Sequence, residues 1–363
     1  MSVPLLSTGE VARALALRDL TDPREGQHAI QRLVDAAVAA LTRAWSCEAV
    51  LSRGTRIVPI TDNYDALGYD VGAVTRDARY TRYVNDHEML RSHTSALVPA
   101  ALRALAPDDA RDDVLLACPG IVYRRDAIDR LHTGTPHQLD LWRVTRARAL
   151  APGDLKEMID VVVRMLLPGA EWRVEPRVHP YTTDGLQLDV ANGDEGVEIG
   201  ECGLAAPPVL RGAGLDEAWN GLALGLGLDR LLMLRKGIAD IRLLRATDAR
   251  IASQMGDLSL YRPVSNRPAI VRDISIAVDD DLDGELLGDH VRAALGDDAD
   301  CVETVEVVAE TPGIELTEIA RARLNWRAGQ KNVLVRVVLR HVERTLTRDE
   351  ANGLRDRIAA AFA

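Results

Sequence analysis

Several residue types are rare in this sequence, and their scarcity excludes particular kinds of site and classes of protein. Its 363 residues include only 4 cysteines and a single phenylalanine, and aromatic residues make up 4%. The cysteines lie far apart with no CxxC pair, which argues against a disulfide framework or a cysteine-based zinc site and predicts a reducing, cytoplasmic location. So few aromatic residues exclude a broad stacking surface for single-stranded nucleic acid. No run approaches about 18 apolar residues, so no membrane-spanning helix is predicted.

Lysine is also rare, and the 55 acidic residues outnumber the 44 basic ones. The formal net charge is −11, and lysine occurs only at Lys156, Lys236 and Lys331. This balance argues against a protein that coats nucleic acid through bulk charge, although a local basic face stays open. The first twenty residues lack a basic region followed by an apolar stretch, so no secretory signal is expected. The length predicts two domains.

The hydrophobic pattern of the first 245 residues predicts α+β architecture. Helical periodicity predicts helices over 28–44, from 93 onward, over 154–167 and over 214–237. Short alternating runs between them predict strands, including one with a glycine turn over 48–60. Strand runs flanked by helices, without regular βαβ spacing, indicate an antiparallel sheet core in a domain spanning 1–245.

A second domain is expected near the C-terminus. Residues 246–264 are rich in turn formers and predict a connector. Residues 265–363 then read as strand, helix, strands and helix, the size of a ferredoxin-like α+β sandwich. This stretch has 13 Lys+Arg against 19 Asp+Glu, a formal charge of −6.

The segment 120–144 has the richest set of polar side chains. On predicted strands, Arg124 shares a face with Asp126, and Gln138 shares a face with Asp140. An arginine beside an acid suits a phosphate together with a base amine. A surface salt-bridge ladder is the alternative.

Two other short motifs stand out. Gly225 and Gly227 allow the backbone to approach a ligand, and Arg230 then lies in the first turn of a helix, where an anion would offset its repulsion by the helix dipole. The alternative is a buried junction between a strand and a helix, at which the glycines allow close packing. His93 and Ser95 mark a helix start, which a simple N-cap would also explain.

Taken together, these motifs resemble phenylalanyl-tRNA synthetase, a class II aminoacyl-tRNA synthetase, in its single-chain organellar form. MLRSHTSA resembles the family's LRxHTS helix start, GIVYRRDAIDRLHTGTPHQLD its motif 2, and GLGLDRLLML its motif 3. HPYTTDG and EIGECGLA resemble two further segments, and SNRPAIVRDISI and ERTLTRDEANGLRDRI resemble the ends of its ferredoxin-fold anticodon-binding domain. The resemblance covers roughly 80–363 in consistent order and implies a class II sheet core.

The resemblance implies activation of an amino acid by ATP, with Mg²⁺ bridging the phosphates, and transfer to tRNA. Arg124 would hold the α-phosphate, Arg230 the γ-phosphate, and His132 would also face the phosphates. Asp126 would accept from the adenine amine. No side chain needs to act as a base, because the substrate carboxylate is already a nucleophile. The implied metal ligands are Glu198, Glu201 and Asp189.

The implied amino-acid pocket departs from the family. His93, Ser95, Gln138 and Asp140 would hold the ammonium and carboxylate groups, with Asp140 one methylene shorter than the family's glutamate. His179 and Tyr181 align with two pocket phenylalanines, and Ala223 with the small residue that leaves room for the ring. These changes predict a pocket of aromatic size but greater polarity, for phenylalanine or a more polar analogue.

The acceptor and the assembly are implied less specifically. The C-terminal domain would hold the tRNA through Arg267, Arg272, Arg336, Arg340 and Arg344. Arg344 fits a helix-capping role equally well. Two alternatives stay open: a synthetase paralogue that passes its amino acid to a non-tRNA acceptor, and a non-catalytic tRNA-binding paralogue. A monomer is expected rather than a homodimer.

Overall fold

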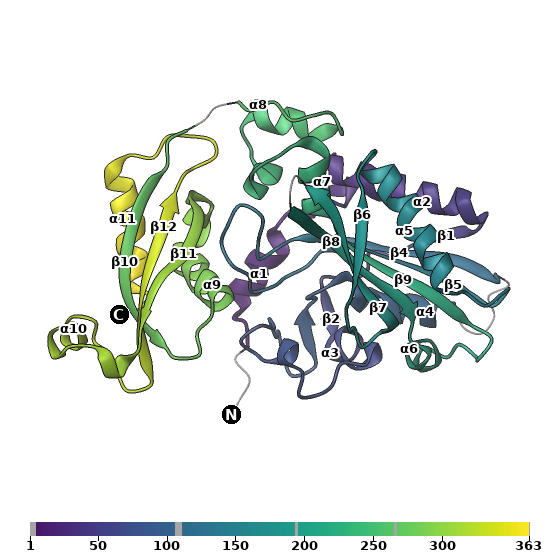
Figure 1. Ribbon diagram of the computed structural model, residues 1–363, viewed down its shortest axis with the longest axis horizontal. Helices are drawn as coiled ribbons and strands as arrows, with labels where there is room; N and C mark the ends of the chain where they lie inside the picture. The colour runs from purple at the N-terminus through teal and green to yellow at the C-terminus, as the bar shows by residue number, and fades with distance from the viewer. Residues whose placement is uncertain (1–4, 106–110, 193–194, 265–266, 363) are drawn as a thin grey trace. The chain divides into compact units, whose positions relative to one another are not determined.

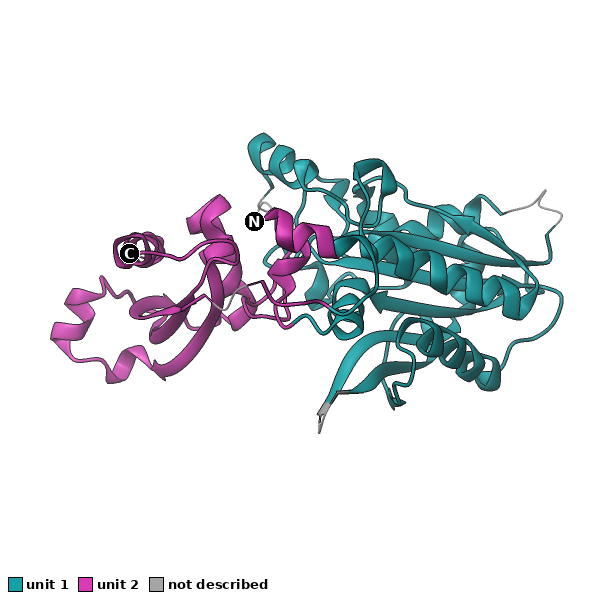
Figure 2. Ribbon diagram, turned by 90° about the horizontal axis from the view of Figure 1, so that it is seen from above, with its two compact units in different colours: residues 1–124, 135–238, 255–260 teal, residues 125–134, 239–254, 261–363 magenta. Residues whose placement is uncertain are grey.

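The computed structural model describes residues 5–105, 111–192, 195–264 and 267–362. They form two compact units that interleave along the chain (Figure 2). Unit 1 comprises residues 1–124, 135–238 and 255–260, and unit 2 comprises 125–134, 239–254 and 261–363. The predicted start of the second domain, residue 265, lies outside the described residues. No helix in the described ranges is both long and apolar enough to cross a membrane.

Unit 1 is built on a seven-stranded sheet of order β1-β4-β5-β9-β8-β7-β6 (Figure 1). Adjacent strands of this sheet pair antiparallel, except β1 and β4, which run parallel. The predicted α+β class with an antiparallel core is confirmed. The strands are β1 (Glu48–Leu51), β4 (Asp113–Ile121), β5 (His137–Thr145), β6 (Trp172–Pro176), β7 (Thr182–Asn192), β8 (Glu195–Ala205) and β9 (Asn220–Gly227).

Three helices pack on one side of this sheet, namely α2 (Ala29–Trp45), α5 (Pro152–Leu166) and α7 (Leu228–Lys236). The buried residues of α2 recur every three or four positions, as in Ile30, Leu33 and Leu41, so its apolar stripe faces the core. Each fully buried leucine or isoleucine contributes about 1.5–3 kcal/mol. The opposite side carries the 3₁₀ helix η4 (Thr94–Leu97) and α4 (Val98–Arg103), which contact β4 or β5.

Two element predictions were wrong. Residues 48–60 do not form one strand with a turn: β1 joins the large sheet, while β2 (Ile57–Pro59) pairs with β3 (Glu88–Leu90). The helix expected over 214–237 begins only at Leu228, because residues 220–227 form β9 in the sheet interior. The smaller elements of unit 1 are α1 (Thr8–Ala16), α3 (Ile60–Asn63), α6 (Pro207–Gly212) and the 3₁₀ helices η1 (Pro23–Glu25), η2 (Asp65–Leu67) and η3 (Val74–Arg76).

Unit 2 has a three-stranded antiparallel sheet of order β10-β12-β11. The elements follow as β10 (Ile270–Asp279), α9 (Gly284–Leu295), β11 (Val302–Thr311), β12 (Gln330–Leu339) and α11 (Arg348–Ala360), with short α10 (Glu318–Arg323) between β11 and β12. Residues 125–134 belong to this unit: Ile128 is buried in its core, and its carbonyl accepts from Val305 N at 2.9 Å. The stretch before β10 holds η5 (Ile241–Arg245), α8 (Ala249–Ala252) and η6 (Ser253–Gly256).

Candidate active site

Strand register builds the floor of the candidate site. Asp140 of β5 and Glu201 of β8 both pair with Gly225 of β9, so the three residues lie in one row and on one face. The next row along β5 holds Trp142 opposite Ala223. A Cβ on Gly225 would lie 3.8 Å from each Asp140 carboxylate oxygen. The glycine therefore leaves space between two carboxylates.

Asp140 is held by donors from the segment that precedes α4. Thr94 Oγ1 donates to it at 2.7 Å and Ser95 Oγ at 2.9 Å. Burial raises the pKa of Asp140, and these hydroxyl donors oppose the shift. Gln138 Oε1 accepts from the Thr94 backbone at 3.2 Å. The two motifs singled out in the sequence therefore meet on the sheet floor.

His93 stands beside this carboxylate. Asn63 Nδ2 lies 3.5 Å from its Nε2, while its Nδ1 is buried without a hydrogen-bond partner among the described residues. Burial, together with the charge of Arg124, lowers the pKa of His93 to about 3. The imidazole is therefore neutral at physiological pH.

Aromatic rings form the wall of the site. His179 stacks on Tyr181 with ring centroids 5.6 Å apart, and Tyr181 lies 6.2 Å from Trp142 and 6.3 Å from Tyr69. Tyr69 in turn stacks on His93 at 5.7 Å. Burial raises the pKa of Tyr181 well above its usual value, so its phenol stays neutral. The structure thus brings His179 and Tyr181 together, and their predicted role toward the amino acid stays a prediction.

The wall also contains the carboxylate of Glu201, which has two nitrogen neighbours. His179 Nε2 lies 3.0 Å from Glu201 Oε2, and Arg177 Nε lies 3.8 Å from Glu201 Oε1. Although burial opposes ionisation, the contact with His179 and the charge of Arg177 lower the pKa of Glu201. A negative charge is thus held at the edge of the floor.

Sequence reasoning missed three members of this site, Asn63, Tyr69 and Trp142. Trp142 has the same parity in β5 as Gln138 and Asp140, so alternation alone could have found it. Asn63 and Tyr69 come from an irregular region with no periodic signal.

The two arginines predicted to bind phosphates each contact a backbone carbonyl of unit 1. Arg124 follows β4, and its Nε donates to the Ser92 carbonyl at 2.9 Å. Arg230 lies in the first turn of α7, and its Nη1 donates to the Glu198 carbonyl at 2.8 Å. A backbone carbonyl thus accepts from each guanidinium, a group whose planar array of donors suits the recognition of phosphates.

Asp126 and His132 lie in unit 2. Arg292 donates to the backbone carbonyl of Asp126, and Asp126 Oδ1 accepts from the Ala127 backbone at 2.9 Å. His132 Nδ1 lies 2.7 Å from Asp129 Oδ2. Their predicted roles toward adenine and phosphates stay predictions.

The three carboxylates predicted as metal ligands do not gather. A bulge in β8 pairs Glu198 with Asp189, while Glu201 pairs with Gln187, which places the carboxylates on one sheet face. Asp189 accepts from Arg173 Nη2 at 3.3 Å, and Glu198 is exposed. Within the described ranges, no three His, Cys, Asp or Glu residues form a group that could hold a metal ion.

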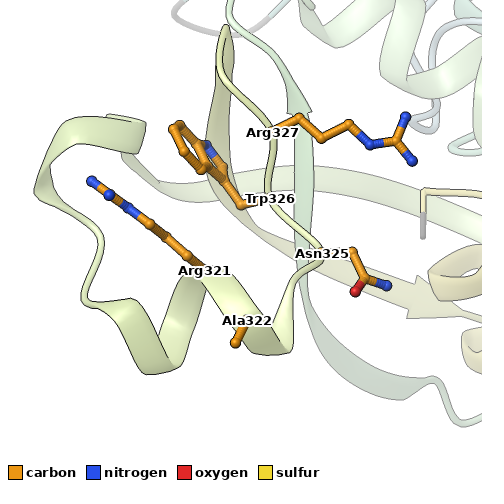
Figure 3. A pocket seen from close by; sticks show the side chains of 5 residues that line it. All are labelled: Arg321, Ala322, Asn325, Trp326 and Arg327. Carbon is orange, nitrogen blue, oxygen red and sulfur yellow. The ribbon is translucent and has the colours of Figure 1, made fainter.

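The five arginines predicted to contact tRNA all have partners within unit 2. These partners are Val342 for Arg267, Asn352 for Arg272, Asp273 for Arg336, Glu303 for Arg340 and Glu350 for Arg344. The Arg344–Glu350 pair at 2.6 Å joins the capping box of α11, which supports the capping alternative. An open pocket beside α10 is lined by other basic side chains, with Arg321 stacked 4.8 Å over the ring of Trp326 (Figure 3).

Comparison with known families decides what this arrangement is. Residues 23–255 match the family model described as tRNA synthetases class II core domain (F). The chain belongs to this family. The matched range contains Arg124, Asp140 and Arg230 of the candidate site.

Curated relatives agree with this assignment. The chain is 29% identical over 317 residues to the chloroplastic/mitochondrial phenylalanine–tRNA ligase of Arabidopsis thaliana, covering 83% of this chain and 68% of the relative. Alpha subunits of phenylalanine–tRNA ligase from Prochlorococcus marinus and Leifsonia xyli are 33% and 34% identical, each over 53% of this chain. The chain spans 56% and 57% of those two subunits, less than two thirds of their length.

Proposed function

We propose that this protein activates phenylalanine or a more polar analogue with ATP, forming an aminoacyl-adenylate, and transfers the amino acid to tRNA. One observation carries the proposal: Asp140, Gly225 and Glu201 form a floor row inside a range that matches a class II core and also contains Arg124 and Arg230. The names of the relatives supply the amino acid and the acceptor.

In this proposal the chemistry is positioning and charge stabilisation. The substrate carboxylate attacks the α-phosphorus, a bond forms to that phosphorus, and pyrophosphate leaves. Arg124 stabilises charge on the α-phosphate, while Arg230 holds the γ-phosphate. Asp126 would accept from the adenine amine and His132 would face the phosphates.

The amino acid would lie over the space that Gly225 leaves. Its ammonium would be held by the carboxylate of Asp140 together with Gln138 and Ser95, and neutral His93 would offer its buried Nδ1 to the carboxylate. Its side chain would then contact the aromatic wall of His179 and Tyr181, next to Ala223.

Polar atoms in that wall bear on which amino acid fits. The imidazole of His179 has its Nε2 3.0 Å from Glu201 Oε2, and its ring face stacks on Tyr181, so an aromatic substrate ring would meet an aromatic wall. An added hydroxyl or amine would also find acceptors here. Phenylalanine and its hydroxylated or aminated analogues are therefore the proposed substrate class.

Mg²⁺ would supply charge neutralisation between the phosphates. It is usually bound by one or two carboxylates plus substrate oxygens, so it does not need three protein ligands. Glu198 is the carboxylate that fits best, because it is exposed and its own carbonyl contacts Arg230, whereas Glu201 already contacts His179 and Asp189 is paired with Arg173.

One observation favours the alternative in which the amino acid is delivered to an acceptor other than tRNA. Arg336, Arg340 and Arg344 are each paired with a carboxylate, which reduces the charge they could offer to phosphates. This pairing favours a paralogue that delivers its amino acid to a non-tRNA acceptor. In either case we propose a cytoplasmic protein that works as a monomer.

Arg124→Ala tests the proposal directly. We expect amino-acid-dependent ATP–pyrophosphate exchange to fall by about 10²–10³, the usual cost of removing one donor that stabilises a transition state. Arg164→Ala is the matched control, because Arg164 is 77% exposed in a surface ion pair with Asp160. Exchange that survives in Arg124→Ala at the level of the control would contradict the adenylation model.

A further inference from the structure

A buried histidine–carboxylate pair joins two segments of the candidate site from behind. His137, the first residue of β5, places its Nδ1 2.9 Å from Asp229 Oδ1, and its backbone N–H donates to Asp229 Oδ2 at 2.5 Å. The imidazole is fully buried, and Asp229 is 5% exposed in the first turn of α7. One carboxylate therefore holds both the backbone and the side chain of His137.

The other ring nitrogen fixes the tautomer. His137 Nε2 lies 3.1 Å from the backbone nitrogen of Leu20, which can only donate. Nε2 must therefore accept, and the proton sits on Nδ1, where it is donated to Asp229. The ring is neutral and bridges two fixed partners.

The segment that holds Leu20 is itself anchored to the site. Asp19 accepts from the Ile121 backbone at 3.1 Å at the end of β4, and lies 3.7 Å from the fully buried Arg91. Arg91 Nε donates to the Ile121 carbonyl at 2.7 Å. His137 is thus connected to the strand that leads into Arg124.

The neighbours of this pair give it a function. Gln138 directly follows His137, and Arg230 directly follows Asp229. Resting on the function proposed above, we propose that His137 and Asp229 are positioning residues that hold the amino-acid-binding Gln138 and the phosphate-binding Arg230 at a fixed separation.

Stability alone accounts poorly for such a pair. Removing a carboxylate from water is costly, and well-packed apolar side chains of similar volume are often at least as stabilising as a buried polar pair. A misplacement of about 1 Å at reacting groups, by contrast, costs up to about 10²-fold in rate. Precise placement of two binding residues is the benefit that the pair provides.

Two substitutions at His137 separate its two contacts. The amide nitrogen of Asn can take the place of Nδ1, so His137→Asn keeps a donor to Asp229 and loses the acceptor for Leu20. The amide oxygen of Gln can take the place of Nε2, so His137→Gln keeps the acceptor and loses the donor. We expect His137→Gln to raise KM for both ATP and the amino acid about 10-fold, and His137→Asn to restore both to within about 3-fold of the parent.

The measurement is ATP–pyrophosphate exchange as a function of each substrate, with Tm measured alongside. A purely structural role would lower the active fraction and hence the apparent kcat, leaving both KM values unchanged in the two variants; that result would overturn the proposal. Equal KM increases in both variants would also overturn it, because ring volume would then be the cause.

Asp229→Asn keeps the proposal testable where His137→Gln fails to fold. The amide oxygen of the new Asn can accept well from only one of the two His137 N–H groups. The KM values for ATP and for the amino acid should therefore rise together, and the change in Tm should be smaller than in His137→Gln. Unchanged KM values would refute the link. Failure of the proposed function is distinguishable, because the parent protein would then show no exchange at all.

Discussion

Among single residues, Asp140 shows most clearly how local chemistry serves the site. The family resemblance of the sequence placed it among the residues that would hold the ammonium and carboxylate groups of the amino acid, and the structure gives it two hydroxyl donors and a glycine neighbour. It could not show that Thr94 would be one of those donors, because that contact joins segments 46 residues apart. Burial of the carboxylate is costly, and these hydroxyl donors offset part of that cost.

Asp140→Asn should therefore separate stability from function. Burial raises the pKa of Asp140 above its usual 3.8, so the folded protein holds this proton more tightly than the unfolded chain does. Ionised Asp140 then reduces the free energy of unfolding at pH 7, and this reduction disappears as the pH falls below 3.8. We expect a higher Tm than the parent at pH 7, a difference that shrinks toward pH 4, and a KM for the amino acid raised at least about 10-fold.

Thermal unfolding across this pH range, with exchange kinetics at pH 7, checks both parts. Thr94 and Ser95 can rotate their hydroxyls to suit the amide, so packing is preserved. A lower Tm at pH 7 would show that the ionised carboxylate is stabilising, contrary to this account.

At the scale of elements, the floor depends on strand register. The sequence predicted the strands of the large sheet well where apolar and polar residues alternate, as in β5 and β8. It failed at β9, because its leucines and glycines fit helical spacing as readily as a buried strand. Cross-strand pairing with β5 and β8, which no local pattern encodes, decides that segment.

Two glycines of the floor should respond oppositely to an added methyl group. A Cβ at Gly225 would make ordinary contact at 3.8 Å with Asp140, so Gly225→Ala should fold with a Tm near that of the parent. The methyl would occupy the space assigned to the amino acid, and we expect its KM to rise about 10-fold or more.

Gly200→Ala is the matched comparison on the neighbouring strand. Its Cβ would lie 2.1 Å from the Gly225 carbonyl oxygen, so the backbone must shift, and we expect about 1–3 kcal/mol of destabilisation. Calorimetry and substrate titration on both variants give the answer. Unchanged affinity for the amino acid in Gly225→Ala would show that the amino acid does not bind over this row.

At the scale of the whole molecule, the two compact units are not consecutive blocks. The sequence places a single connector at 246–264, whereas unit 2 also includes the segment 125–134, which lies in the chain between β4 and β5 of unit 1. Tertiary contacts cause this: Arg130 pairs with Glu303, and Ile128 lies in the core of unit 2. Nothing in the local pattern of 125–134 marks it as part of a distant fold.

Gly288 tests how firmly unit 2 holds that segment. A Cβ at Gly288 of α9 would lie 2.6 Å from the Asp126 carbonyl oxygen, so Gly288→Ala should loosen residues 125–130. Hydrogen exchange of their backbone amides should become faster, by about 10-fold, as contacts to α9 are lost.

Gly284→Ala on the same helix is the control, because a Cβ there meets nothing within 4 Å. It should leave exchange in 125–130 unchanged. Equal protection of the segment in both variants would show that its close approach to α9 does not hold it in unit 2.

The central claim is adenylate formation at the floor row. The most direct measurement is amino-acid-dependent ATP–pyrophosphate exchange without tRNA, across the twenty standard amino acids and hydroxylated and aminated phenylalanine analogues. The account predicts exchange with phenylalanine or with one of these analogues, and its loss in Arg124→Ala. Absence of exchange with every amino acid in the panel would contradict it.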